Sequence, residues 1–158
     1  MRYFPIFYDL KDRPVTVIGG GDSAMEEATF LTRFASKVYV IHRKDTLRAS
    51  KIMQQRVMDN EKVEVLTNTV IDEIVGQHDP FKKVTGVRLR DALTNETRIL
   101  ELDGVFIAIG HKPTSELFAG VLDMDAHGYI TPQHGTSKTN VPGVFVAGDV
   151  ADSVYRQA

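Results

Sequence analysis

Three consecutive glycines, at positions 19 to 21, separate two segments of different hydrophobic periodicity. The four residues before them, Val15 to Ile18, are all β-branched, which is typical of a short strand. The segment after them places small and apolar side chains at helical spacing, namely at Ala24, Ala28, Leu31 and Ala35. A glycine turn that joins a strand to a helix predicts the start of a βαβ unit with a parallel sheet.

The residue types in this turn fit a loop that binds the pyrophosphate of a dinucleotide. Gly19 allows a tight bend, Gly21 allows the backbone to approach the phosphates, and Ala24 allows the helix to pack closely against the strand. Free N–H groups and the helix dipole favour an anion at this point. Asp22 would repel a pyrophosphate, so we expect its carboxylate to point away and to cap the helix N-terminus. The alternative is a glycine-rich loop without a ligand.

Basic residues follow the second predicted strand. In NAD-specific domains, an acidic residue about 20 positions beyond the glycines accepts a hydrogen bond from the ribose 2′-hydroxyl. Here Lys37 to Ile41 leads into His42, Arg43 and Lys44, and Arg48 follows. These cations can surround a 2′-phosphate, with bidentate contacts from the guanidinium groups, so we predict a preference for NADP(H). The alternative is that the basic run is only a solvated face.

The bulk composition is that of an ordinary globular domain. A length of 158 residues suggests one domain, and a formal net charge of −2 gives no field suited to nucleic acid or to an anionic membrane. The longest apolar stretch, Val105 to Ile109, is too short to cross a membrane. The first residues lack the features of a signal peptide, so we expect a cytoplasmic protein.

The chain contains no cysteine. It therefore cannot carry a disulfide, a thiolate nucleophile or a Cys-ligated metal, and any thiol–disulfide chemistry must reside elsewhere. The five histidines show no close spacing of metal ligands, so we expect no metal site.

The pattern beyond the basic run predicts the rest of a βαβαβ half. Residues Arg48 to Asp59 contain no Gly or Pro and predict a helix whose apolar side carries Ile52, Met53, Val57 and Met58. Val63 to Leu66 then predicts a third strand.

Three β-rich runs follow: Val70 to Val75, Val84 to Arg90 and Thr97 to Leu102. The connectors between them hold about five residues, too few for crossover helices, so the runs predict an antiparallel meander. Gly104 to Ile109 is a continuous apolar run, typical of a buried parallel strand. The predicted fold is α/β, a Rossmann-like doubly wound parallel sheet with an inserted antiparallel β-meander.

Gly110 follows that strand at the edge where open α/β sheets bind ligands, so it is a candidate for close approach to a nicotinamide. The alternative is a simple turn glycine. Farther along, we expect at most one helical turn at Ser115 to Phe118, a short strand at Gly128 to Thr131 and another buried strand at Val144 to Ala147.

Five segments together resemble the NADPH-binding domain of the low-molecular-weight thioredoxin reductases, in the pyridine nucleotide-disulfide oxidoreductase family. They are VTVIGGGDSAMEEATFLTRFASKV, IHRKDTLRASKIM, VTGVRLRD, FIAIGHKP and GVFVAGDV, the last followed by YRQA. They span nearly the whole chain, from about Val15 to Ala158.

The resemblance implies two sets of cofactor residues. The NADPH site would be lined by residues of the turn, the basic run and the loop after the buried strand, namely Gly19, Gly20, Gly21, Asp22, Ser23, Ala24, Glu26, His42, Arg43, Lys44, Arg48, Ile109 and Gly110. Gly148 and Asp149 resemble residues that hold the ribityl and phosphate region of FAD, and Arg156, Gln157 and Ala158 resemble those beside the isoalloxazine ring. Lys44 replaces an arginine common in the family.

The resemblance also implies a division of the chain and a role in a larger enzyme. We expect a lead-in at 1–14, the NADP(H)-binding domain at 15–147 and the start of a returning FAD-domain segment at 148–158. In the complete enzyme, a homodimer, NADPH would reduce FAD, which would reduce a disulfide and then thioredoxin. FAD would belong to the complete enzyme only, and the isolated chain, which resembles a truncated piece, would bind NADP(H) without turnover.

One departure leaves alternatives open. The family has a Cys-x-x-Cys motif where Arg2 to Pro5 stands here. The parent could therefore be a cysteine-free NADPH reductase that passes electrons to ferredoxin or a quinone-like acceptor. A second alternative is a stand-alone nucleotide-binding module without electron transfer.

Overall fold

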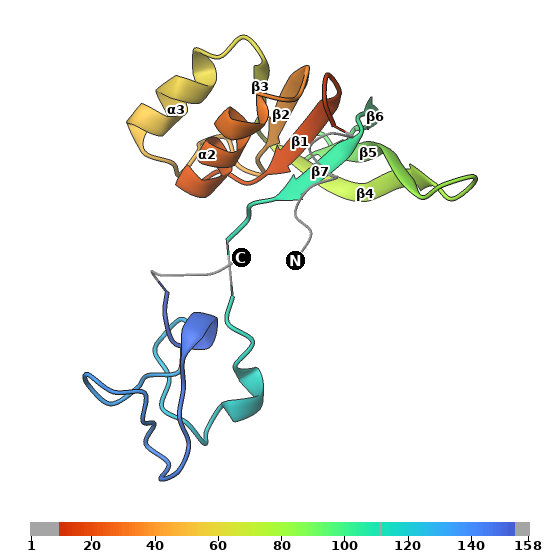
Figure 1. Ribbon diagram of the computed structural model, residues 1–158. Coiled ribbons are helices and arrows are strands. Elements are labelled where there is room, and N and C mark those ends of the chain that lie inside the picture. The colour runs from red at the N-terminus through yellow and green to blue at the C-terminus, as the bar shows by residue number, and fades with distance from the viewer. Residues whose placement is uncertain (1–9, 111, 154–158) are drawn as a thin grey trace. The chain divides into compact units, whose positions relative to one another are not determined.

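The computed structural model describes residues 10–110 and 112–153. The chain forms two compact units, residues 1–110 and 111–158, and each has a hydrophobic core of its own. The first unit holds the predicted α/β fold (Figure 1).

A four-stranded parallel sheet forms the centre of the first unit. Its strands are β1 (Pro14–Ile18), β2 (Lys37–Ile41), β3 (Val63–Leu66) and β7 (Gly104–Ile107), in the order β3-β2-β1-β7. Val15 is in register with Val38 of β2 and with Gly104 of β7, so the carboxyl ends of β1, β2 and β7 share one edge of the sheet. That edge is where the prediction placed the ligand.

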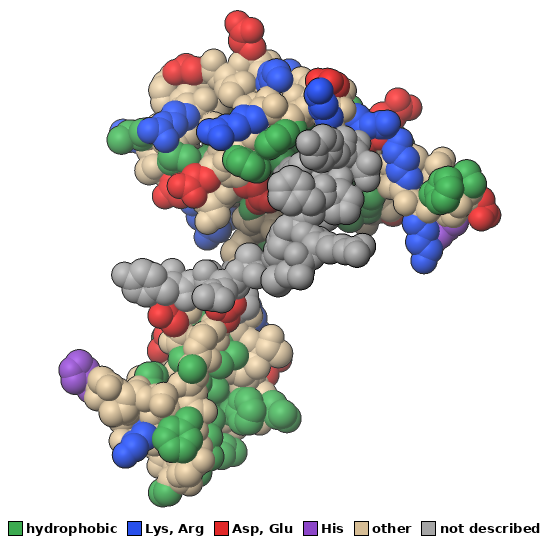
Figure 2. All heavy atoms as spheres, viewed as in Figure 1, with side chains coloured by type: hydrophobic (Ala, Val, Ile, Leu, Met, Phe, Trp, Pro, Cys, Tyr) green, Lys and Arg blue, Asp and Glu red, His purple; other side chains and the backbone are tan. Residues whose placement is uncertain are grey.

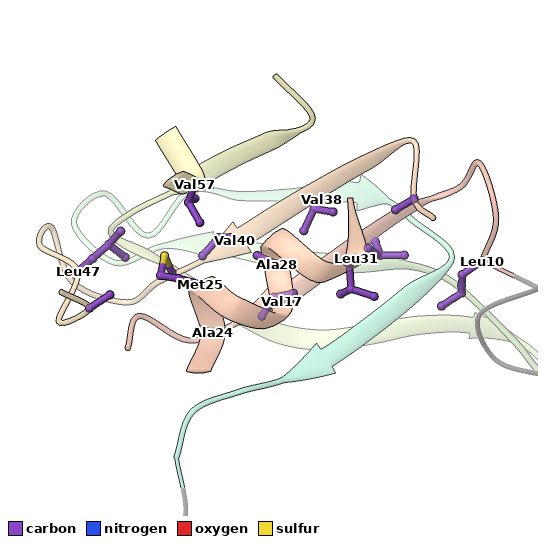
Figure 3. Packing of buried hydrophobic residues seen from close by; sticks show 13 residues of the cluster. Leu10, Val17, Ala24, Met25, Ala28, Leu31, Val38, Val40, Leu47 and Val57 are labelled. Atoms are coloured by element: carbon purple, nitrogen blue, oxygen red, sulfur yellow. The ribbon is translucent and has the colours of Figure 1, made fainter. Parts of the chain in front are cut away.

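Helices α2 (Asp22–Leu31) and α3 (Lys51–Met58) cover one face of this sheet (Figure 1). Alternate residues of the two central strands, Val15, Val17, Val38 and Val40, are fully buried against the helices. Ala24, Met25, Ala28 and Leu31 present the apolar side of α2 to them (Figure 3). This packing fixes the start of α2 above the end of β1.

An antiparallel meander packs on the other face. Its strands are β4 (Thr69–Gln77), β5 (Lys83–Asp91) and β6 (Thr97–Glu101), which pair in that order. Val87, Leu89 and Leu102 are buried in one cluster with Ile41 of β2. The predicted antiparallel meander and the predicted fold class are confirmed.

Helix α3 is shorter and less buried than predicted. It begins at Lys51, after the N-cap residue Ser50. Val57 is buried and Met53 packs against the core, one helical turn apart, but Ile52 and Met58 are 70% and 61% exposed. Only two of the four residues on the predicted apolar side therefore pack against the core, because a helix this short touches the sheet along a single i, i+4 stripe.

Strand β7 ends at Ile107 and lies at the edge of the parallel sheet. Among the described residues it pairs only with β1. The side chains of Ile107 and Ile109 are 65% and 62% exposed, so the expectation that Gly104 to Ile109 is buried throughout was wrong. Ile107 is the last residue of this edge strand and Ile109 lies beyond it, so both residues are at the margin of the packed sheet.

The second unit has a small core of Leu122, Ile130 and Val146. Two 3₁₀ turns are present, η1 (Glu116–Phe118) and η2 (Gly148–Val150). The strands expected at 128–131 and 144–147 were wrong: each segment forms one isolated bridge, Met124 with Ile130 and Lys138 with Phe145. Neither segment has a neighbouring ladder to extend.

This unit also exposes apolar surface. Leu117, Val121 and Phe145 are largely exposed, and Figure 2 shows hydrophobic side chains gathered on the unit's surface. The two compact units divide at Gly110, and the expected division by cofactor at residue 147 stays a prediction. The reason for the division at Gly110 is that Leu122 and Ile130 share their core with Val146 and not with the first unit.

Within the described part of the chain, no helix is long and apolar enough to span a membrane.

Candidate functional site

The glycine turn connects β1 to α2, and its first glycine is closely packed. A Cβ at Gly19 would lie 2.8 Å from the Ala24 Cβ and against the carbonyl oxygen of Ala108. Ala24 itself is fully buried. These contacts agree with the expected role of small residues in bringing the helix close to the sheet.

The third glycine faces open space. A Cβ at Gly21 would meet nothing within 4 Å. Gly21 is the N-cap of α2, and no described residue accepts a hydrogen bond from the backbone N–H groups of Gly21, Asp22 or Ser23. The first turn of α2 therefore presents unpaired amide donors next to free volume, which suits an anion.

Asp22 does not cap its own helix, and that prediction was wrong. α2 has no side-chain cap, because Asp22 is the first helical residue and the preceding position is a glycine. The Oδ1 atom of Asp22 instead accepts a hydrogen bond of 2.7 Å from the backbone N–H of Ser50, the residue before α3.

The basic run forms a loop that folds back onto the glycine turn. We call residues 42–50 the basic loop. The N–H groups of Arg48 and Ala49 both donate to the Gly20 carbonyl, at 2.7 and 2.9 Å. Leu47 and Ala49 are buried in the core that covers the parallel sheet. The loop is thus fixed to the turn at Gly20 and to the core by its apolar residues.

His42 begins the basic loop and is only 7% exposed. Its Nε2 lies 3.1 Å from the Thr46 carbonyl, which can only accept, so Nε2 carries the hydrogen. A Cβ at Gly20 would collide with the imidazole ring. His42 therefore packs on the glycine turn and closes the loop around itself.

The turn and the basic loop form walls of one cavity of about 370 Å³. Its lining residues come from the ends of β1 and β2, the turn, the loop, the start of β4 and the segment after β7: Ile18, Gly19, Gly20, Ile41, His42, Arg43, Arg48, Thr69, Val70, Ile71 and Ile109. Apolar residues and two arginines thus border the same space.

The cations of the basic loop have no acidic partner among the described residues. The side chains of Arg43, Lys44 and Arg48 are exposed, and no residue in the described ranges pairs with them. Asp45, the acid within the loop, accepts a hydrogen bond of 2.7 Å from the Thr46 hydroxyl and does not engage Arg48. Arg43 and Arg48 line the cavity, whereas Lys44 does not.

The other predicted site residues lie outside the cavity lining. Ser23 and Glu26 are exposed on α2. Gly110 adopts a positive φ of 95° with open space around it. Gly148 and Asp149 form part of η2 in the second unit.

Arg156, Gln157 and Ala158 lie outside the described residues, as do Arg2 and Pro5. Within the described ranges, no group of three or more His, Asp or Glu side chains could hold a metal.

Strand β4 contributes to the cavity, which was not predicted from the sequence. Thr69, Val70 and Ile71 line the cavity, and the Thr69 N–H donates to the His42 carbonyl at 3.0 Å. The sequence contained a signal for this contact, because only two residues separate β3 from β4. Since β3 pairs with β2 in parallel, the meander must begin beside the carboxyl end of β2.

Comparison with known proteins supports this arrangement. Residues 5–158 match the family described as pyridine nucleotide-disulphide oxidoreductase. A thioredoxin reductase of Mycolicibacterium smegmatis is 57% identical over 148 residues, which cover 94% of this chain and 46% of that protein. Thioredoxin reductase 2 of Arabidopsis thaliana is 49% identical over 154 residues, covering 98% of this chain and 39% of that protein.

A solved structure gives the same result. The thioredoxin reductase from Giardia duodenalis matches with a TM-score of 0.74 and 40% identity, over 96% of this chain and 49% of that one. The chain thus spans about half the length of the relatives it matches, and the predicted resemblance to thioredoxin reductases is confirmed. The chain belongs to the pyridine nucleotide-disulphide oxidoreductase family.

Proposed function

We propose that this chain binds NADP(H) in the cavity between the glycine turn and the basic loop, as the nucleotide-binding part of a thioredoxin reductase-like flavoenzyme. One observation carries the proposal. Arg43 and Arg48 line the same cavity as the turn, and no described residue neutralises their guanidinium groups. Such cations at the end of β2 suit a 2′-phosphate, whereas a ribose 2′-hydroxyl would call for a carboxylate.

The residues present fit the two charged groups of the nucleotide. The unpaired amides of Gly21, Asp22 and Ser23 would hold the pyrophosphate, since the space over Gly21 is open. Arg43 and Arg48 would hold the 2′-phosphate by charge-assisted hydrogen bonds. Lys44 would add charge from outside the cavity, and Ile109 and Gly110 would border the nicotinamide half.

The names of the relatives suggest an activity for the parent enzyme. Several are called thioredoxin reductase, and we propose the same activity for the whole protein to which this chain corresponds. NADPH, when bound, supplies a hydride that the flavin accepts. The chain's own contribution is to bind and orient the nucleotide. Thioredoxin as acceptor, a cytoplasmic location and a homodimeric parent belong to the same proposal and rest on the resemblance.

The second unit is proposed to contribute to the FAD site. Gly148 has a φ of +74° and open space where a Cβ would point, which leaves room for the ribityl and phosphate region of a flavin near Gly148 and Asp149. The residues 156–158 would lie beside the ring. The exposed Leu117, Val121 and Phe145 support the view that further chain of the parent covers this unit. The unit division at Gly110 supports assigning all of residues 111–158 to the FAD-binding part.

Replacement of the two arginines tests the nucleotide preference. Arg43→Ala and Arg48→Ala should each weaken NADPH binding by roughly 1.5–3 kcal/mol and NADH binding much less. Arg88→Ala is the matched control, because Arg88 is an exposed arginine of the meander that pairs with Glu73. Equal losses for the two nucleotides in calorimetric titrations would show that Arg43 and Arg48 do not read the 2′-phosphate.

A second candidate function is favoured by the residues at positions 2 to 5. Arg2 and Pro5 stand where the family has its two cysteines. This substitution favours a parent that transfers electrons from NADPH to an acceptor other than a disulfide. An assay of the full-length parent separates the two candidates, because robust thioredoxin-dependent disulfide reduction would exclude this one.

A further inference from the structure

The basic loop is attached to the glycine turn by three consecutive backbone amides. The N–H groups of Arg48 and Ala49 donate to the Gly20 carbonyl, and the N–H of Ser50 donates to the Asp22 carboxylate at 2.7 Å. The acceptor of the first two bonds is a backbone atom that every sequence provides. The acceptor of the third bond is the Asp22 side chain. Among these three hydrogen bonds, this is therefore the one whose acceptor a substitution can remove directly.

We propose that Asp22 is a positioning residue for nucleotide specificity, which holds the basic loop so that Arg48 and Arg43 border the cavity. The inference rests on the proposed binding of NADP(H). In this proposal the carboxylate needs no contact with the nucleotide. It acts through Ser50, whose N–H it fixes two residues beyond Arg48.

The location of Asp22 excludes a simple electrostatic benefit. It is the first residue of α2, adjacent to the unpaired amides that would hold the pyrophosphate. A negative charge at this point repels phosphates, so its Coulomb effect on any dinucleotide is unfavourable. A favourable contribution to binding must therefore come from the hydrogen bond to Ser50, which requires an acceptor but no charge.

Asp22→Asn is therefore the variant that separates the effect of the charge from the effect of the hydrogen bond. Asp22→Asn keeps an acceptor oxygen and removes the charge, whereas Asp22→Ala removes both. We expect Asp22→Ala to weaken NADPH binding roughly five- to tenfold and NADH binding less than twofold. We expect Asp22→Asn to bind NADPH at least as tightly as the unchanged chain.

A double substitution tests whether Asp22 acts through the arginines. In an Arg43→Ala/Arg48→Ala background, Asp22→Ala should cause no further selective loss of NADPH binding, because the groups that it positions are absent. Asp45→Ala serves as the matched control. Asp45 is an exposed acid of the same loop that bonds only Thr46 among the described residues, and its removal should not weaken NADPH binding.

The measurements are calorimetric titrations of the whole chain with NADPH and with NADH. Unchanged NADPH affinity in Asp22→Ala, equal losses for both nucleotides, or an equal loss in Asp45→Ala would each overturn the inference. So would tighter NADPH binding in Asp22→Ala, which would show that the charge dominates. A misfolded variant is recognised because it loses the binding of both nucleotides completely, and Asp22→Asn, which keeps the acceptor, then decides the inference.

The arginine variants allow the proposed binding of NADP(H) and the proposed role of Asp22 to be tested separately. If Arg48→Ala binds NADPH and NADH as the unchanged chain does, the proposed function fails and the inference fails with it. If Arg48→Ala loses NADPH selectively while Asp22→Ala does not, the inference alone fails.

Discussion

The three glycines of the turn have different surroundings. Gly19 accommodates Ala24 and the Ala108 carbonyl, Gly20 accommodates the His42 ring, and Gly21 borders open space. The structure agrees with the predicted close packing at Gly19, whereas ligand approach at Gly21 stays a prediction. The role of Gly20 was not predictable, because the partner of this glycine comes from the end of β2 and is brought there by the basic loop.

Alanine substitutions at Gly20 and Gly21 should separate stability from binding. Gly20→Ala should lower the free energy of unfolding by roughly 1–3 kcal/mol, since its Cβ would displace the buried His42 ring. Gly21→Ala should lower it by less than about 1 kcal/mol, because Gly21 has an extended backbone and free space, yet should weaken NADPH binding. Urea unfolding and nucleotide titration measure the two effects. A reversed order of stabilities would contradict the packing described for the turn.

At the scale of elements, the hydrophobic patterns predicted the strands and the meander, which depend mainly on residues close together in the sequence. The strands Lys37–Ile41 and Val63–Leu66 have the predicted bounds, and the meander has the predicted antiparallel pairing. Contacts between distant segments were not predictable. Asp22 and Ser50 are 28 positions apart, and their hydrogen bond depends on the path of the basic loop. The segment 144–147 has the pattern of a strand, but in the described part of the second unit it pairs only through the isolated bridge between Lys138 and Phe145 and forms no ladder.

One ion triad links the elements of the two sheets. Asp103, just before β7, bonds Lys83 at the start of β5 at 2.6 Å and Arg13 just before β1 at 2.9 Å. Partial burial raises the pKa of Asp103, but the hydrogen bonds and charges of Lys83 and Arg13 outweigh this and lower the pKa below its ordinary value. A lowered folded-state pKa means that ionised Asp103 stabilises the fold above the unfolded pKa of about 4.

Asp103→Asn should therefore lower the free energy of unfolding by about 1 kcal/mol at neutral pH, a modest value because both cations are partly exposed. The difference from the unchanged chain should shrink as the pH falls below about 4 and through the folded-state pKa. Chemical denaturation at a series of pH values measures it, with the exposed Glu61→Gln as control. A difference that stays constant with pH would exclude the triad as its source.

At the scale of the whole molecule, the chain has one predicted nucleotide site in the first unit and predicted flavin contacts in the second. It spans about half the length of its relatives. The length of the chain suggested one domain, because length alone carries no information on how the core divides. The division at Gly110 depends on which apolar residues share a core, and that is not visible in periodicity alone.

The purified chain should bind NADPH without oxidising it. The proposed FAD contacts of the second unit are only part of a flavin site, and the first unit is proposed to hold and orient the nucleotide alone. Absorbance of the sample in the flavin region and the decay of NADPH absorbance measure this. A yellow sample with stoichiometric FAD and NADPH turnover would contradict the assignment of the chain as a nucleotide-binding part.

The proposed function depends above all on a preference for the 2′-phosphate, which a paired calorimetric titration of the unchanged chain with NADPH and NADH measures. Two arginine contacts of roughly 1.5–3 kcal/mol each predict NADPH binding at least about a hundredfold tighter than NADH binding, with a difference that decreases as salt is added. Equal affinities for the two nucleotides, or tighter binding of NADH, would contradict the proposed role of Arg43 and Arg48.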